Sequence, residues 1–205
     1  MEIQEETKEK LRATKEINEK TQEDPKNIQT HVPHRPTHAS STIDWASANG
    51  QLDVLKWWWE RKEIDGRELK YTSEAIDWAS KNGHLDVLKW WQVRKEQDGW
   101  ELKYTPQAID WASKNGHLDV LKWWRVRKEQ DGWELKYTHQ AIDWASNNGH
   151  LNVLQWWQAR KEQDGWELKY THWVIDRASE NGHLNVLQWW QDRKEQDGWE
   201  LKYTE

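Results

Sequence analysis

A 33-residue pattern recurs five times along this chain of 205 residues and limits the possible folds more than any other feature. Tryptophan returns at the same place in four successive units and arginine takes the fifth, as Trp45, Trp78, Trp111, Trp144 and Arg177. A fixed period of this length is the signature of a repeat solenoid, in which each unit buries its apolar face on its neighbours. We therefore predict an elongated repeat domain over residues 40–205. Its units are 40–72, 73–105, 106–138, 139–171 and 172–204.

Each unit is predicted to contain two helices. In the second unit, Thr72 or Ser73 can cap a short first helix, which Asn82-Gly83 ends. From Leu85 to Trp91 the apolar residues then follow helical spacing and make a face too wide for a surface helix. We expect neighbouring units to cover this second helix on both sides.

An extended connection is expected after each second helix. Asp98-Gly99 is a turn signal, and Trp100, Leu102 and Tyr104 then alternate with polar residues. A period of two favours an extended segment with one face covered. The predicted fold class is an all-α solenoid of helix-turn-helix units with extended, hairpin-like connections.

Composition agrees with a packed, water-soluble array. The chain has 20 Trp, no Phe and no Cys, and a net charge of -6. A Trp side chain buries about 150–250 Å², so most of these rings must pack. The charge gives no basic field for a nucleic acid, and no apolar stretch has the length of a membrane span. We expect a cytoplasmic protein that binds neither nucleic acid nor membrane.

Residues 1–39 differ from the units, because they are densely charged and contain prolines. We predict a separate and mostly flexible tail. Three histidines, His31, His34 and His38, lie close together in it. No cysteine or carboxylate stands at a matching spacing, so we interpret them as part of a polar linker and expect no metal.

Residues 107–124 resemble an ankyrin repeat. Gln107-Ala-Ile-Asp-Trp-Ala-Ser-Lys-Asn-Gly-His117 aligns with the family's Thr-Pro-Leu-His-x-Ala-Ala-x-x-Gly-His, and Leu118-Asp-Val-Leu-Lys-Trp-Trp124 with its apolar second helix. The similarity covers residues 40–204 and is nearest to divergent, Trp-rich repeats of the fungal and amoebal kind. Asp110 replaces the family's His, and its Gly-Ala-Asp is missing. The resemblance implies a scaffold that binds proteins on a concave surface.

Two polar series recur once per unit, and both are interpreted as structural. The histidines after Asn-Gly are expected to bond backbone in the neighbouring turn, since units about 10 Å apart cannot share a zinc ion. The aspartates of the first helix are expected to bond the next unit's backbone rather than to act as acid and base. We predict no catalytic residue and no cofactor. The two series are His84, His117, His150 and His183, and Asp44, Asp77, Asp110, Asp143 and Asp176.

Two further Trp series raise a choice between core and binding platform. Paired rings of the second helix are predicted to pack in the core; they are Trp57–Trp58, Trp90–Trp91, Trp123–Trp124, Trp156–Trp157 and Trp189–Trp190. The rings after the Asp-Gly turn are better candidates for exposure, although packing is favoured there too. They are Trp100, Trp133, Trp166 and Trp199.

Positions where near-identical units differ are the best candidates for partner contacts. They flank the first helix, at unit positions two and nine. Neutral drift on a solvated face is the open alternative. Three of the Trp rings that follow the Asp-Gly turn are added to these positions. The candidate partner-binding residues are then Glu74, Lys81, Gln107, Lys114, Gln140, Asn147, Trp173, Trp100, Trp133 and Trp166.

The function predicted from these patterns is a non-enzymatic scaffold for a protein partner. One rival is a structural protein whose copies join end to end into fibres. Arg177, Glu180 and Asp192 oppose that rival, because they place charge at the last unit and suit a polar cap. A monomer is therefore favoured, with Trp59 covered by the N-terminal segment. Another rival is a Trp-lined platform for carbohydrate or nucleic acid.

Overall fold

The computed structural model describes residues 42–66 and 68–199. The predicted tail of residues 1–39 lies outside this part of the chain, and so do His31, His34 and His38. Trp59, which was expected to lie under the N-terminal segment, contacts the second unit in the described residues: its indole N–H donates to Asp98 at 3.1 Å, and the guanidinium of Arg94 lies 4.3 Å from its ring centroid.

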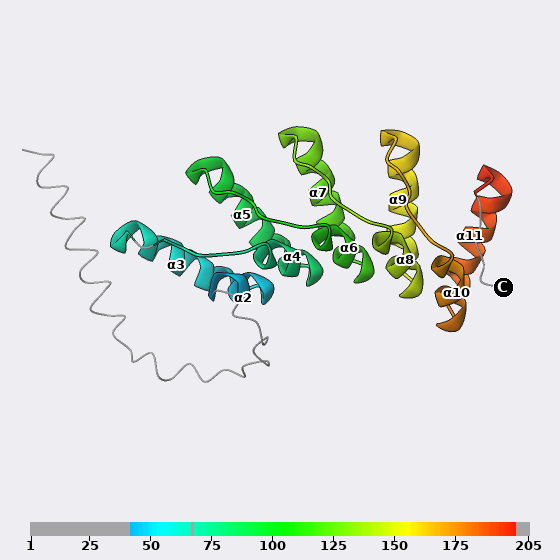
Figure 1. The fold of residues 1–205 in the computed structure, drawn as a ribbon, viewed down its shortest axis with the longest axis horizontal. Helices are drawn as coiled ribbons and strands as arrows, with labels where there is room; N and C mark the ends of the chain where they lie inside the picture. Colours follow the sequence, from blue (N-terminus) through cyan, green and yellow to red (C-terminus); the bar gives the residue numbers. More distant parts are fainter. Residues whose placement is uncertain (1–41, 67, 200–205) are drawn as a thin grey trace, which may run out of the picture. The chain divides into compact units, whose positions relative to one another are not determined.

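Every regular element in the described residues is a helix, and short and long helices alternate along the chain (Figure 1). The first helices of the units are α2 (Thr42–Ala48), α4 (Glu74–Lys81), α6 (Gln107–Lys114), α8 (Gln140–Asn147) and α10 (Trp173–Glu180). The second helices are α3 (Leu52–Asp65), α5 (Leu85–Asp98), α7 (Leu118–Asp131), α9 (Leu151–Asp164) and α11 (Leu184–Asp197). None of the described helices is long and apolar enough to cross a membrane.

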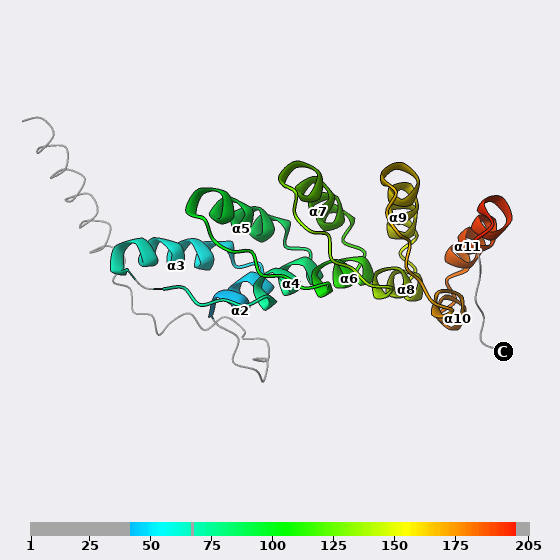
Figure 2. The same ribbon diagram turned by 45° about the horizontal axis from the view of Figure 1, so that its top comes forward.

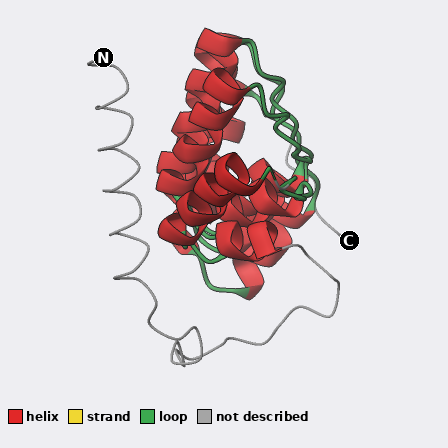
Figure 3. Cartoon of the chain, turned by 90° about the vertical axis from the view of Figure 1, so that its left-hand side faces the viewer, coloured by secondary structure: helices red, strands yellow, loops and turns green. Residues whose placement is uncertain are grey.

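The helices form two rows. Each first helix packs along the next first helix and against the second helix of its own unit, while neighbouring second helices touch over a smaller area. Figures 1 and 2 show the first helices side by side, with the second helices rising from them. In the view along the rows, the connections run along one side of the helices (Figure 3). This repeated packing of helix pairs is an all-α solenoid.

Local sequence explains where the helices begin and end. The Thr138 hydroxyl accepts a hydrogen bond from the backbone N–H of Gln140, at 3.1 Å, and so caps α8. Thr72 does the same for Glu74 at 3.1 Å, which selects Thr72 over Ser73 as the capping residue. Gly99 ends α5 in the left-handed region, with φ 70°.

The core lies between the helix rows and is continuous from unit to unit. In units two to five, one ring of each Trp pair is almost completely buried, and its indole N–H donates to a serine of the preceding unit; for example, Trp91 Nε1 lies 3.0 Å from Ser47 Oγ. The predicted burial of the pairs is confirmed in the last four units. The pair in the first unit differs, because Trp57 is 49% exposed where Trp90 is 9% exposed.

The connections are extended and one face of each is covered, as predicted. Trp100, Leu102 and Tyr104 pack against the core, whereas Glu101 and Lys103 are exposed. No strand forms among the described residues, so the hairpin-like pairing that was expected does not occur there. A side chain links successive connections instead: the Tyr71 hydroxyl donates to the backbone carbonyl of Glu101, at 2.8 Å.

Candidate interaction surface

One Trp series lies outside the hydrophobic core. We call Trp45, Trp78, Trp111 and Trp144 the tryptophan row. Each ring stands on the outer side of a first helix and is only partly buried, while the other Trp rings of units two to four pack in or against the core. Trp78 and Trp111 touch edge to face, with ring centroids 5.5 Å apart. A large ring that is not needed in the core can be used for binding.

Lysines cover part of the tryptophan row. Lys81 Nζ lies 3.9 Å from the ring centroid of Trp78 and 5.0 Å from that of Trp111. Lys114 Nζ lies 4.8 Å from the centroid of Trp144. Burial, with repulsion from Lys114, lowers the pKa of Lys81. Each such cation–π contact is worth roughly 0.5–1 kcal/mol at an exposed site, so a partner can displace the lysine at small cost.

The last two units depart from this arrangement at three places that meet in space. Asn147 stands where the second and third units have lysine, Trp173 where the second to fourth units have glutamate or glutamine, and Arg177 where all four preceding units have tryptophan. These three residues, with Lys114 and Trp144, line a hollow of about 720 Å³ over α8 and α10. We call it the C-terminal hollow.

Trp173 is the more accessible of the two Trp rings that line the C-terminal hollow, with 48% of its surface exposed. The guanidinium of Arg177 lies 4.5 Å from its ring centroid. Arg177 also donates to Glu180, with Nη1 and Oε2 2.6 Å apart. An exposed Trp held in place by an Arg is the kind of residue that dominates protein interfaces.

The predicted contact positions flank the tryptophan row. Glu74, Gln107, Gln140 and Trp173 lie at the start of the first helices, and Lys81, Lys114 and Asn147 at their ends, all of them partly or fully exposed. The row itself was not among the predicted contact residues. A signal was present, however, because Arg177 replaces its fifth member and an arginine does not suit a buried position.

Three predicted contact residues lie elsewhere. Trp100, Trp133 and Trp166 pack on the Trp pairs of their own units; Trp133, for example, lies 5.6 Å from Trp123 between ring centroids and is 8% exposed. The left-handed glycine before each ring turns the chain back over the second helix and lays the ring on it. We therefore correct that part of the prediction and leave these rings out of the surface.

The aspartate series is structural, as predicted, but each described bond goes to the last threonine of the aspartate's own unit and not to the backbone of the next unit. Asp77 accepts the backbone N–H of Thr105 at 2.9 Å and its hydroxyl at 2.8 Å. Equivalent pairs join Asp44 to Thr72, Asp110 to Thr138 and Asp143 to Thr171. Each of these aspartates therefore holds in place the threonine that stands directly before the next unit. Burial raises the pKa of Asp77 to about 6, and the bonds to Thr105 oppose that shift.

The histidine series also joins units. A Cβ added to Gly116 would lie 2.8 Å from Nδ1 of His150, so the ring rests directly on the glycine of the preceding unit. A hydrogen bond with the Lys114 backbone supports the predicted contact with the neighbouring turn, while burial lowers the pKa of His150. Within the described residues, no group of three potential metal-binding side chains occurs.

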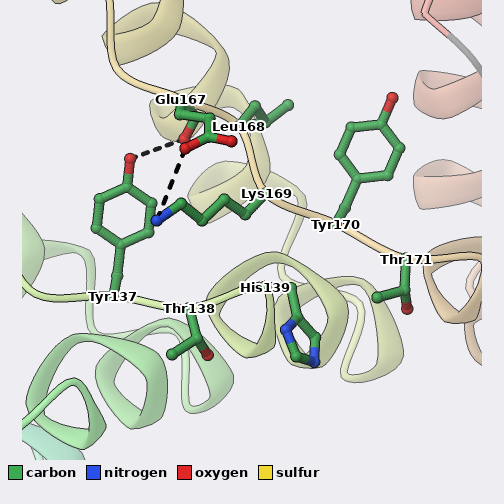
Figure 4. Close-up of a pocket in the computed structure, with 8 residues that line it drawn as sticks. All are labelled: Tyr137, Thr138, His139, Glu167, Leu168, Lys169, Tyr170 and Thr171. Atoms are coloured by element: carbon green, nitrogen blue, oxygen red, sulfur yellow. Dashed lines mark hydrogen bonds and ion pairs between the residues drawn. The ribbon is translucent and has the colours of Figure 1, made fainter.

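A second hollow lies between two successive connections and is occupied by its own side chains (Figure 4). The hydroxyl of Tyr137 donates to the backbone carbonyl of Glu167 at 2.7 Å. Lys169 Nζ lies 4.9 Å from the ring centroid of Tyr137 and 3.7 Å from a carboxylate oxygen of Glu167. Lys103 over Tyr71 repeats this arrangement, at 5.0 Å. The hollow is thus part of the unit's architecture, whereas the C-terminal hollow is lined by Asn147, Trp173 and Arg177, which the other units replace by different residues.

Comparison with protein-family models and with curated proteins finds no match for this sequence.

Proposed function

We propose that the protein is a non-enzymatic scaffold that binds another protein along the tryptophan row. The observation that carries this proposal is the position of the row. Its rings lie outside the core, and the units differ at positions on either side of it. A constant aromatic strip with variable edges suits recognition, because the strip supplies contact area and the edges supply selectivity.

The proposal includes an ankyrin type for the units. The first helices of the last four units begin 33 residues apart, at Glu74, Gln107, Gln140 and Trp173. The Asn-Gly-His turn between the helices and the apolar second helix support the same assignment. In this view Asp110, which replaces the family's histidine, bonds to Thr138 and fixes the start of the next unit.

A protein partner fits the surface better than a glycan or a nucleic acid. Lysines already cover part of the rings, and the edges offer amides and charges of both signs. Such a mixture matches a protein surface, which presents apolar and polar groups together. A nucleic acid would require a positive field, and the chain has a net charge of -6.

The experiment exchanges residues between units, so that each variant carries a side chain the array already accommodates. The double variant Trp173→Gln and Asn147→Lys gives the C-terminal hollow the residues of the third unit at these two positions. Partners captured from the extract of the source cells are identified and retested as purified proteins. We expect the double variant to bind at least tenfold more weakly, the size of effect typical for loss of a central Trp.

Asp192→Ala is the matched control. It places the fourth unit's residue, Ala159, at an exposed position on α11, away from the tryptophan row. Binding of the purified partner by this variant should equal that of the wild type. Equal binding by the double variant and the wild type would show that the C-terminal hollow is not the contact site.

A further inference from the structure

The contact between neighbouring units is made by the same few bonds at each junction. The indole N–H of Trp124 donates to Ser80 Oγ at 3.3 Å, and Asn115 Nδ2 donates to the carbonyl of Lys81 at 2.7 Å. Val120 is fully buried in the same junction. Each unit therefore has an acceptor face, which carries the serine, and a donor face, which carries the tryptophan and asparagine.

The donor face of the first unit is uncovered in the described residues. Val54 is 36% exposed, while its equivalent in the second unit, Val87, is 0% exposed. Trp57 is likewise 49% exposed. The indole N–H of Trp58, which corresponds to that of Trp124, meets no acceptor among the described residues. The donor groups of a junction are thus present without an acceptor face against them.

The acceptor face of the fifth unit is uncovered in the same sense. Ser179 is exposed, whereas its equivalent in the fourth unit, Ser146, is 0% exposed and bonded to Trp190. Leu184 is 63% exposed at this end. Gly182 has open space where Gly149 has the ring of His183 against it. This face keeps the serine, the glycine and the apolar residues of an internal junction.

We propose that the two faces bind each other, so that the first unit of one copy stacks on the fifth unit of a second copy. Trp58 would donate to Ser179, and Asn49 to the carbonyl of Glu180, as their equivalents do inside the chain. The second copy is the occupant because this contact continues the junction already present between units. One group is missing, since Gln51 stands where later units have histidine.

The charges of the last unit do not prevent this contact. Arg177 and Glu180 neutralise each other at 2.6 Å on the outer side of α10, the side that carries the tryptophan row. In the stacked pair Arg177 comes beside Trp45 of the second copy, where a cation over a ring is favourable. Asp192 is exposed on α11, at a position where the second to fourth units have valine or alanine and the first has Glu60. Of the three charged residues that oppose end-to-end joining, only Asp192 therefore still does so.

A contact between two different faces does not close on itself, so copies add one after another. The average mass in solution should rise with concentration and pass that of a dimer. This association uses the two end faces of the array, and the tryptophan row takes part only where Arg177 of one copy comes beside Trp45 of the next.

The experiment measures mass by sedimentation velocity and light scattering over a wide range of concentration. Val54→Glu places a charge on the donor face, and Ser179→Glu places one on the acceptor face; both positions are exposed, so each variant should fold. Each single variant should remain monomeric. Gln155→Glu is the control, because it makes an equal charge change at an exposed position on α9, and it should associate like the wild type.

Mixing the two variants gives the sharpest result. Ser179→Glu retains an intact donor face and Val54→Glu an intact acceptor face, so the mixture should form one-to-one dimers and nothing larger. A wild type that stays monomeric at every concentration would overturn the proposal, as would a dimer that survives Ser179→Glu. Partner capture by Ser179→Glu should equal that of the wild type, which separates this proposal from the proposed function.

Discussion

A glycine and a histidine meet at each of the four junctions between the five units. The ring of each histidine rests on the glycine of the preceding unit, and that glycine has a positive φ, 75° at Gly116. Two separate constraints thus act on one residue. The backbone requires a residue that tolerates the left-handed region, and the ring leaves no room for a side chain.

Gly116→Ala should therefore destabilise the protein more than Gly132→Ala. Both glycines belong to the third unit and have similar φ, 75° and 69°, but an added Cβ meets His150 at 2.8 Å only at Gly116. The left-handed backbone costs roughly 1–2 kcal/mol in each variant, and the crowding at Gly116 adds to it. Urea unfolding measures both values, and equal losses would refute the contact with His150.

A second prediction at the residue scale concerns pH. The pKa of Asp77 is raised from 3.8 to about 6 because burial disfavours the carboxylate. The folded state thus takes up a proton more readily than the unfolded chain. This contribution to stability is fully present below pH 3.8 and is lost as the pH rises through about 6. A shift of about two units corresponds to at most about 3 kcal/mol.

The measurement compares the free energy of unfolding of the wild type with that of Asp77→Asn at pH 7.5 and pH 5. The difference should move in favour of the wild type at the lower pH. The comparison is needed because His150 acts in the opposite direction: its lowered pKa removes stability as the pH falls through its ordinary value of 6.5. A difference that does not change with pH would contradict the burial argument.

At the scale of the element, one threonine hydroxyl links three parts of the chain. Thr138 donates to Asp110 at 2.7 Å, at the end of a connection, and accepts the N–H of Gln140 at the start of α8. The start of each first helix in units two to five is thereby tied to the first helix before it. This bond explains how a short helix of 8 residues keeps its register.

Thr138→Val should lower the free energy of unfolding by about 1–3 kcal/mol, because it removes a helix cap and a hydrogen bond to a buried carboxylate. Thr138→Ser keeps the hydroxyl and should retain most of the stability. Thermal unfolding followed by circular dichroism measures both variants. Similar melting temperatures for the Val and Ser variants would mean that the hydroxyl contributes little.

The helices could be predicted from the sequence, but the connections only in part. Capping threonine, Asn-Gly and Asp-Gly mark helix ends by local chemistry, so Thr72 and Gly83 are readable from neighbouring residues alone. Strand pairing depends instead on a second backbone at the right distance. Here it is the Tyr71 side chain that bonds to the next connection. The alternation of apolar and polar residues has a period of two whether an extended segment pairs as a strand or only packs on the core.

The candidate surface was predicted at its edges and missed at its centre. Variation between the units identified Gln107 and Lys114 as candidate contact residues, because a position that differs between near-identical units is either exposed and free to change or selected for binding. Trp111 and Trp133 recur equally often, so repetition cannot tell which ring is exposed. The direction of the chain after the left-handed Gly132 decides it, since that turn lays Trp133 on the second helix.

At the scale of the whole molecule, stability comes from junctions, and the end units have fewer of them. The hydrophobic cluster runs through all five units, yet Trp57 and Leu184 at its two ends are exposed. In such an array the stability of a unit depends on its immediate neighbours. Interior units should therefore open less often than the units at the ends.

Hydrogen exchange monitored by mass spectrometry tests this expectation. Backbone amides of α6 and α8 should exchange several times more slowly than those of α2 and α10, although all four helices share an Ile-Asp pair and an Ala-Ser pair and have 7 or 8 residues. Units of such similar sequence serve as controls for one another. Uniform exchange rates would show that the array opens as a single cooperative block.

The bonds that recur at the junctions each span a fixed number of residues, 34 for asparagine to carbonyl and 44 for tryptophan to serine. Adding or removing one whole unit preserves all these separations, while a shift of a single residue breaks them together. Recombination between such similar tandem segments changes the number of units in whole steps. The reach of the tryptophan row can thus lengthen or shorten between generations without any new contact having to evolve.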